Sequence, residues 1–214
     1  MSIEKITSKD DLDDSLYEVR KAYRLLKEYQ ERILNIVFYI KEKLSMPEVI
    51  GDRWFCDPLR KKKNGYLKLF PGMWSWDFMY SYEFEYNFGD VELDENREYS
   101  LSIVQVSDTG YYEKEAADKN DISTFLRSDL SNSLFLFILV VKDVEDDWLW
   151  QERIEEIKDR LLLSSDTTYC EKGVFASKKY SLSEFIDQGS TNSVLLDFSV
   201  LVNAECNVEL VKEE

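Results

Sequence analysis

Strict alternation of aromatic rings with other residues runs through one segment, WSWDFMYSYEFEYNF, from Trp74 to Phe88. Every even-numbered position carries a ring, which makes eight rings in one line. Side chains alternate between the two faces of a β-strand, so all of these rings would project from one face. The pattern predicts one long strand, with the carboxylates Asp77, Glu83 and Glu85 on its opposite face.

The N-terminal part of the chain has a different period. Between about Asp11 and Leu44, apolar residues recur in steps of four and three, with one polar interruption at Gln30. This spacing predicts a single helix about 50 Å long. Charged residues flank the seam as far as Gln30, whereas the apolar face widens from Ile33. We expect the wide half to pack on a sheet and the narrow half to pair with another helix, in this chain or in a second copy.

Shorter apolar runs predict the remaining elements. Strands are expected at Tyr66–Phe70, Tyr99–Ser107, Leu134–Lys142, Tyr169–Ala176 and Ser193–Asn203. Helices are expected at Ile122–Leu130, at Val144–Leu163 and, as a short turn, from Ser181, where Ser181 and Glu184 have the spacing of a capping box. The order of elements predicts an α+β fold, with a long N-terminal helix packed on a largely antiparallel sheet and a second helix between strands. We expect a single domain, in which residues 1–46 form the helix and residues 47–214 the α+β body.

Histidine is absent from the 214 residues. This absence excludes Ser-His-Asp and Cys-His catalysis and zinc sites with histidine ligands. The sequence also lacks GxGxxG, GxxxxGK[ST] and GxSxG motifs, so nothing in it points to a phosphate-binding loop or a nucleophile elbow. An enzyme would have to use carboxylates, lysine, tyrosine or cysteine, and no cofactor is implied.

The carboxylates of the long strand allow one catalytic interpretation. Glu83 and Glu85 are two positions apart on a strand, so they would lie side by side and could hold one divalent cation. With Asp77 and Lys68 they would form the site of a metal-dependent nuclease or phosphodiesterase. The Asp…Glu-x-Lys pattern typical of such nucleases is not present, because Glu85 stands where the lysine would fall. We therefore favour a solvated sheet face without metal or catalysis.

The charge balance indicates the kind of partner. Lys+Arg 27 against Asp+Glu 43 gives a net charge of −16, which repels nucleic acid and anionic membranes and favours a protein with a basic surface. A single helix cannot cover all eight rings, so we expect some of them to be exposed and to bind a partner. The expected partner-binding residues lie at the ends of the ring-bearing strand and at the start of the second helix: Trp74, Trp76, Phe88, Asp146, Asp147 and Trp148.

Three dispersed cysteines without CxxC spacing indicate reduced thiols, and the sequence shows no apolar leader segment and no apolar run long enough to span a membrane. These features predict a cytoplasmic protein. Together with the charge, they lead us to expect an acidic intracellular interaction module of inhibitor, immunity or adaptor type, which binds a basic protein surface without catalysis. A homodimer formed through the N-terminal helix is compatible with this function.

Overall fold

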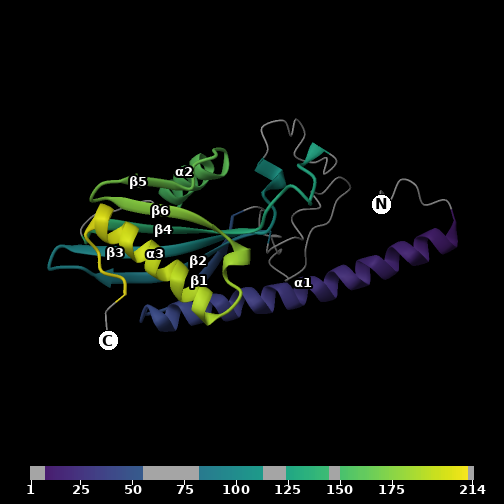
Figure 1. Ribbon diagram of the computed structural model, residues 1–214, viewed down its shortest axis with the longest axis horizontal. Helices are drawn as coiled ribbons and strands as arrows, with labels where there is room; N and C mark the ends of the chain where they lie inside the picture. The colour runs from purple at the N-terminus through teal and green to yellow at the C-terminus, as the bar shows by residue number, and fades with distance from the viewer. Residues whose placement is uncertain (1–7, 55–81, 113–123, 145–149, 212–214) are drawn as a thin grey trace, which may run out of the picture. The chain divides into compact units, whose positions relative to one another are not determined.

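The computed structural model describes residues 8–54, 82–112, 124–144 and 150–211, shown as ribbon in Figure 1. The chain forms two compact units, Met1–Tyr39 and Ile40–Glu214. The elements, in chain order, are α1 (Lys9–Lys43), β1 (Ile50–Arg53), β2 (Glu83–Glu92), β3 (Arg97–Val106), the 3-10 turn η3 (Thr109–Tyr112), β4 (Leu134–Asp143), α2 (Trp150–Leu162), β5 (Thr168–Glu171), β6 (Phe175–Ser181), the 3-10 turn η5 (Leu182–Glu184) and α3 (Gln188–Cys206).

The predicted α+β class is confirmed, with a long N-terminal helix, a sheet of six antiparallel strands and two further helices. The strand order is β1-β2-β3-β4-β6-β5. Strands β3 and β4, at the centre, pair over ten residues each, from Arg97↔Asp143 to Val106↔Leu134. Within the described residues, no helix is long and apolar enough to cross a membrane.

Helix α1 begins at a reciprocal cap formed by Ser8 and Asp11. The backbone N–H of Asp11 donates to the Ser8 hydroxyl, and the backbone N–H of Ser8 donates to the Asp11 carboxylate, both at 3.1 Å. These bonds satisfy amide groups that have no partner inside the helix. The helix then continues for 35 residues.

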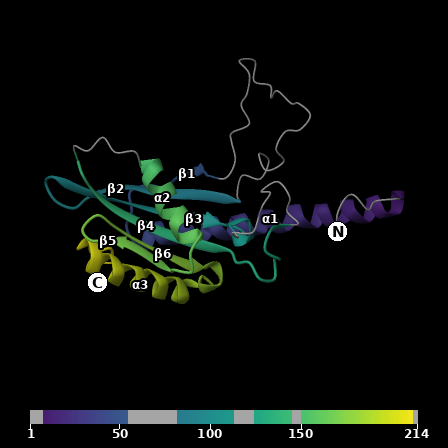
Figure 2. The same ribbon diagram turned by 90° about the horizontal axis from the view of Figure 1, so that it is seen from above.

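Helices α2 and α3 cover opposite faces of the sheet (Figures 1 and 2). Because side chains alternate along β4, Leu136 and Ile138 pack with Ile154 and Ile157 of α2. On the other face, the ring of Phe137 lies 5.2 Å from that of Phe198 in α3. Burial on both faces explains why β4 is a continuous apolar run, LFLFILVV, instead of an alternating one.

The described part of the ring-bearing segment is strand β2, and residues 74–81 lie outside the described residues. Its faces alternate as predicted as far as Phe88, with Glu83 and Glu85 on the α2 side. The register then shifts between Asn87 and Asp90, where Gly89 adopts a φ of 78°. Such a bulge moves the following residues to the other face, so Asp90 joins the side that carries the two glutamates.

Several predicted elements need correction. The segment Ser193–Asn203 is not a strand but the centre of α3, which begins at an Asp187–Ser190 capping box and ends at Asn207 with a φ of 57°. The expected strand Tyr169–Ala176 is a hairpin, in which Gly173 joins β5 to β6. In place of the expected helix, Phe125 lies in a bend, residues 126 and 127 have no regular structure, and residues 128–130 form a turn.

The other differences concern ends and omissions. Strand β1 was not predicted, and it pairs with β2 from Ile50↔Asn87 to Arg53↔Phe84. The capping box of Ser181 and Glu184 is confirmed. The expected strand Tyr66–Phe70, residues 122 and 123, and residues 145–149 of the expected second helix lie outside the described residues.

Candidate functional site

The two glutamates of β2 are the predicted site residues that the structure describes most fully, and both are buried. The Lys158 ammonium of α2 lies 2.6 Å from Glu83 Oε1. The Tyr112 hydroxyl donates to Glu83 Oε2. Burial, together with the neighbouring Glu83 carboxylate, holds the pKa of Tyr112 well above its ordinary value, so this hydroxyl keeps its proton at neutral pH.

Glu85 has neutral partners. Its Oε1 accepts a hydrogen bond of 2.5 Å from the Ser102 hydroxyl of β3, and its Oε2 accepts one of 2.7 Å from the indole Nε1–H of Trp54. The Lys158 ammonium lies 5.3 Å from the centre of the Trp54 ring. The same lysine therefore contacts Glu83 directly and also contacts Trp54, the residue that donates to Glu85. We call Trp54, Glu83, Glu85, Tyr112 and Lys158 the buried cluster; its three charged members are buried, and Trp54 and Tyr112 are partly buried at its edge.

The expectation of a solvated carboxylate face is therefore wrong, because α2 covers it. Both carboxylate oxygens of each glutamate already accept hydrogen bonds: those of Glu83 from Lys158 and Tyr112, and those of Glu85 from Ser102 and Trp54. A cation placed between the two glutamates would have to displace these donors. In the described part of the chain, no group of three or more Cys, Asp or Glu residues is arranged to hold a metal ion. Asp77 and Lys68 lie outside the described residues, so their predicted roles stay predictions.

Sequence reasoning missed the lysine of this cluster, although a signal exists. Lys158 is four positions after Ile154 and three before Leu161, so it falls on the apolar stripe by which α2 packs on the sheet. A charged residue on such a stripe needs a buried counter-ion. The alternating glutamates of β2 are the acidic residues that a covering helix would meet.

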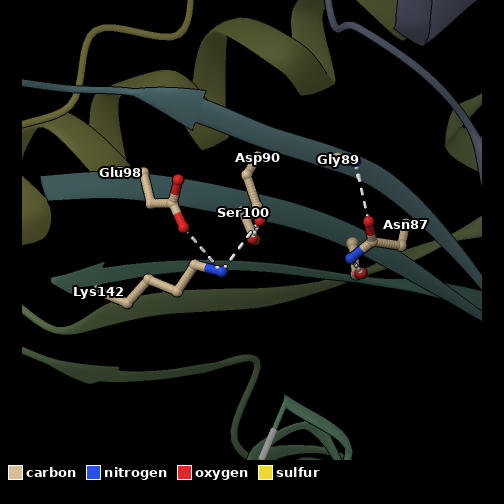
Figure 3. A network of polar contacts seen from close by, with 7 residues as sticks. Asn87, Gly89, Asp90, Glu98, Ser100 and Lys142 are labelled. Atoms are coloured by element: carbon tan, nitrogen blue, oxygen red, sulfur yellow. Dashed lines mark hydrogen bonds and ion pairs between the residues drawn. The ribbon is translucent and has the colours of Figure 1, made fainter. Parts of the chain in front are cut away.

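A second polar network continues along the same face of the sheet (Figure 3). Lys142 of β4 lies 3.0 Å from Asp90 and 2.9 Å from Glu98, and Ser100 donates a hydrogen bond to Asp90. Burial alone would lower the pKa of Lys142, but its bonds to Glu98 and Asp90 raise it above the ordinary value. The Asn87 side chain accepts from the Gly89 N–H at 2.8 Å, which fixes the bulge that brings Asp90 to this face.

The ring-bearing face of β2 does not supply the exposed ring that was expected. Phe88 is fully buried, so it belongs to the core and not to a docking surface. Tyr86 is also buried and donates a hydrogen bond to Gln105. Trp74 and Trp76 lie outside the described residues, as do Asp146, Asp147 and Trp148, and their partner-binding roles stay predictions.

A shallow pocket of about 620 Å³ lies between β6 and the first turns of α3, and its lining includes Lys178, Tyr180 and Asp197. Its charged groups already bond to one another. Asp197 accepts bonds from the Lys178 ammonium at 2.6 Å and the Tyr180 hydroxyl at 2.5 Å. Partial burial would raise the pKa of Asp197, but these two bonds hold it below its usual value. The arrangement ties β6 to α3.

The N-terminal unit presents a row of exposed apolar side chains along α1. At positions spaced by four and three, its large side chains are open to solvent: Leu12 44%, Leu16 43%, Val19 45%, Tyr23 72% and Leu26 40%. We call these five residues the α1 seam. The seam residues recur at the a and d positions of successive heptads, which is the spacing of a helix that packs along another helix.

The architecture and these surfaces define a protein of the α+β class with a buried polar cluster and an exposed helical seam. The chain matches the family described as PM0109 over residues 9–207, and it belongs to that family. No curated protein matches the chain, and no solved structure does.

Proposed function

We propose that the protein is a non-catalytic interaction module, of inhibitor, immunity or adaptor type, and that α1 is its docking element. The observation that carries the proposal is the exposed α1 seam. A contiguous stripe of large apolar side chains on a soluble surface is typical of a site that a partner covers. Helices that dock present anchors at this spacing, both in grooves and in coiled coils.

The buried cluster supports a structural role more than a catalytic one. Glu83 and Lys158 neutralise each other between β2 and α2, and their side chains are 1% and 7% exposed. A substrate would reach them only if α2 moved away from the sheet. The cluster fixes α2 in one position, because an ion pair in the core is favourable only when its geometry is satisfied.

The net charge of −16 supports a basic partner for the body of the chain. Opposite charge speeds encounter with such a partner, and the same charge disfavours nucleic acid and anionic membranes. We extend the proposal to a cytoplasmic location, because the cysteines are sparse and because Cys170 and Cys206 are free thiols.

Photo-cross-linking in the native cell tests the docking role. A benzophenone amino acid replaces Tyr23 in the seam or, as a matched control, Tyr17, which is also an exposed tyrosine of α1 but lies off the seam. We expect irradiation to give a covalent protein adduct from position 23 and a several-fold weaker one from position 17, because only the seam is covered by a partner. Adducts of equal yield from the two positions, or none from position 23, would refute the docking role of α1.

A further inference from the structure

The α1 seam coincides with a segment whose charge differs from that of the rest of the chain. Residues 9–27 carry five basic and five acidic side chains, so the segment is neutral in a protein of net charge −16. The charges are also separated along it. Four of the five acidic residues, Asp10, Asp11, Asp13 and Asp14, come before four of the five basic residues, Arg20, Lys21, Arg24 and Lys27. The exceptions are Lys9, at the start of the segment, and Glu18, between the two groups.

The acidic half has a local explanation, whereas the basic half has one only in part. Carboxylates in the first turns stabilise a helix through its dipole. The basic stretch lies in the middle of α1, which continues to Lys43. The helix dipole stabilises charges only in the first and last turns, so it does not explain basic residues in the middle. Local ion pairs account for Lys21, which lies 3.0 Å from Glu18, and for Lys27, which bonds Glu31. Among the described residues, no carboxylate forms an ion pair with Arg20 or Arg24, and both side chains are exposed. The Arg20 guanidinium lies 5.9 Å from the centre of the Tyr17 ring, a contact that leaves its charge unpaired.

We infer that the partner of the α1 seam is a second copy of this chain, whose α1 pairs with the first in antiparallel orientation over residues 9–26. The inference rests on the proposed docking role of the seam and names its occupant. An antiparallel pair places the acidic turns of each helix beside the basic stretch of the other. Because the arrangement is two-fold symmetric, each favourable contact occurs twice.

The heptad positions give the register of this pair. Leu12 and Val19 occupy d positions of the heptad. Asp13 and Arg20 directly follow them, so these two charged residues flank the seam on the same side. In an antiparallel pair these flanking positions face each other, and Asp13 of one copy lies beside Arg20 of the second copy. The four central layers of the seam are then apolar: Leu12 with Tyr23, Leu16 with Val19, and the same pairs repeated by symmetry. At each end, Leu26 of one copy lies beside Lys9 of the second copy.

A parallel, in-register pair is disfavoured by the same charges. It would place the acidic turns beside each other and the basic stretches beside each other. Its flanking contacts would join Ser15 to Arg20 and Ala22 to Lys27, which offers no opposite charges. The paired length in the antiparallel register is about 26 Å, which is short for a coiled coil. We therefore expect a dissociation constant in the micromolar range.

Sedimentation equilibrium of the full chain tests the association. We expect a reversible dimer at tens of micromolar, and a dissociation constant raised about 100-fold or more in Leu16→Ser/Tyr23→Ser. The matched control is Tyr17→Ser/Leu25→Ser, which removes two exposed apolar side chains of the same helix that lie off the seam. It should dimerise as the parent chain does. A monomeric parent at 200 µM, or a dimer that the seam variant leaves intact, would overturn the inference.

Charge reversal tests the orientation. Asp13→Arg and Arg20→Asp should each raise the dissociation constant about tenfold, because each creates two like-charge contacts. The double variant Asp13→Arg/Arg20→Asp recreates both opposite-charge contacts and should return it to within about threefold of the parent value. Far-UV circular dichroism confirms that the variants keep α1. Single reversals without effect, or a double variant weaker than both single variants, would contradict the antiparallel pair.

Failure of this inference can be told from failure of the proposed function. If the parent chain is monomeric but position 23 cross-links to a different protein, α1 is a docking element and the second copy is the wrong occupant. If the chain is monomeric and position 23 gives no adduct, both proposals are wrong.

Discussion

Lys158 shows at the scale of one residue how a charged side chain can be part of a core. Its stem lies on the apolar stripe of α2, and its ammonium reaches Glu83 of β2 and the face of the Trp54 ring. An ion pair of this kind contributes little compared with an apolar replacement, but the loss of one partner leaves a buried charge without compensation. The pair therefore specifies where α2 lies more than it adds stability.

Lys158→Met is expected to lower the free energy of unfolding by about 3 kcal/mol or more, because it leaves the Glu83 carboxylate buried without its cation. The double variant Glu83→Gln/Lys158→Met should recover much of this loss, since no charge then remains unpaired. Urea denaturation of the parent, the two single variants and the double variant measures the coupling. Glu155→Gln, on the exposed side of α2, is the control and should change stability by less than about 0.5 kcal/mol. Additive single effects would contradict the pairing.

Helix α3 shows at the scale of one element how sequence patterns can mislead. The run SVLLDFSVLVN is rich in apolar and β-branched residues, which favours a strand. The structure has a helix there, in which Val194, Phe198 and Val202 are buried at intervals of four while Leu196 and Val200 are exposed. The Asp187–Ser190 capping box is the signal that favours a helix over a strand here, because it marks a helix start just before the apolar run.

Phe198 and Val200 give a direct test of this assignment. They are two residues apart, so a strand would place them on one face, whereas a helix places them on nearly opposite sides. We expect Phe198→Ala to lower the free energy of unfolding by about 3–5 kcal/mol, because the ring packs against Phe137. Val200→Ala should change it by less than about 0.5 kcal/mol, because Val200 is 71% exposed. Equal losses in the two variants, measured by chemical denaturation, would contradict the helix.

The sequence predicts those features that depend on residues close together in the chain, and it misses those that depend on contacts between distant residues. The period of α1, the apolar run of β4 and the cap at Ser181 are local patterns, and each was predicted correctly. The burial of Glu83 and Glu85 depends on α2, which lies about 75 residues further along the chain, as the Glu83–Lys158 contact shows. The bulge at Gly89 depends on pairing with β3. Such long-range causes leave only indirect signals, such as Lys158 on an apolar stripe.

At the scale of the whole molecule, the charge is unevenly distributed along the chain. Residues 9–27 are neutral, so the net charge of −16 is carried by the remaining residues. Two copies can therefore approach through α1 without the repulsion that would oppose contact elsewhere. The same acidic remainder stays available for the basic partner proposed for the body of the chain, so that partner and the second copy bind different parts of the sequence.

The most direct test of the central claim is a distance between two copies. A spin label is attached at Glu28→Cys, an exposed position off the seam, after Cys56, Cys170 and Cys206 are changed to alanine. In the antiparallel pair the two labels lie about 21 residues apart along the helix axis, and with the spacing of packed helices their separation is about 35–40 Å. Double electron–electron resonance at concentrations that favour the dimer should give this distance. A separation of about 20–25 Å would indicate a parallel pair, and no defined distance would contradict pairing through α1.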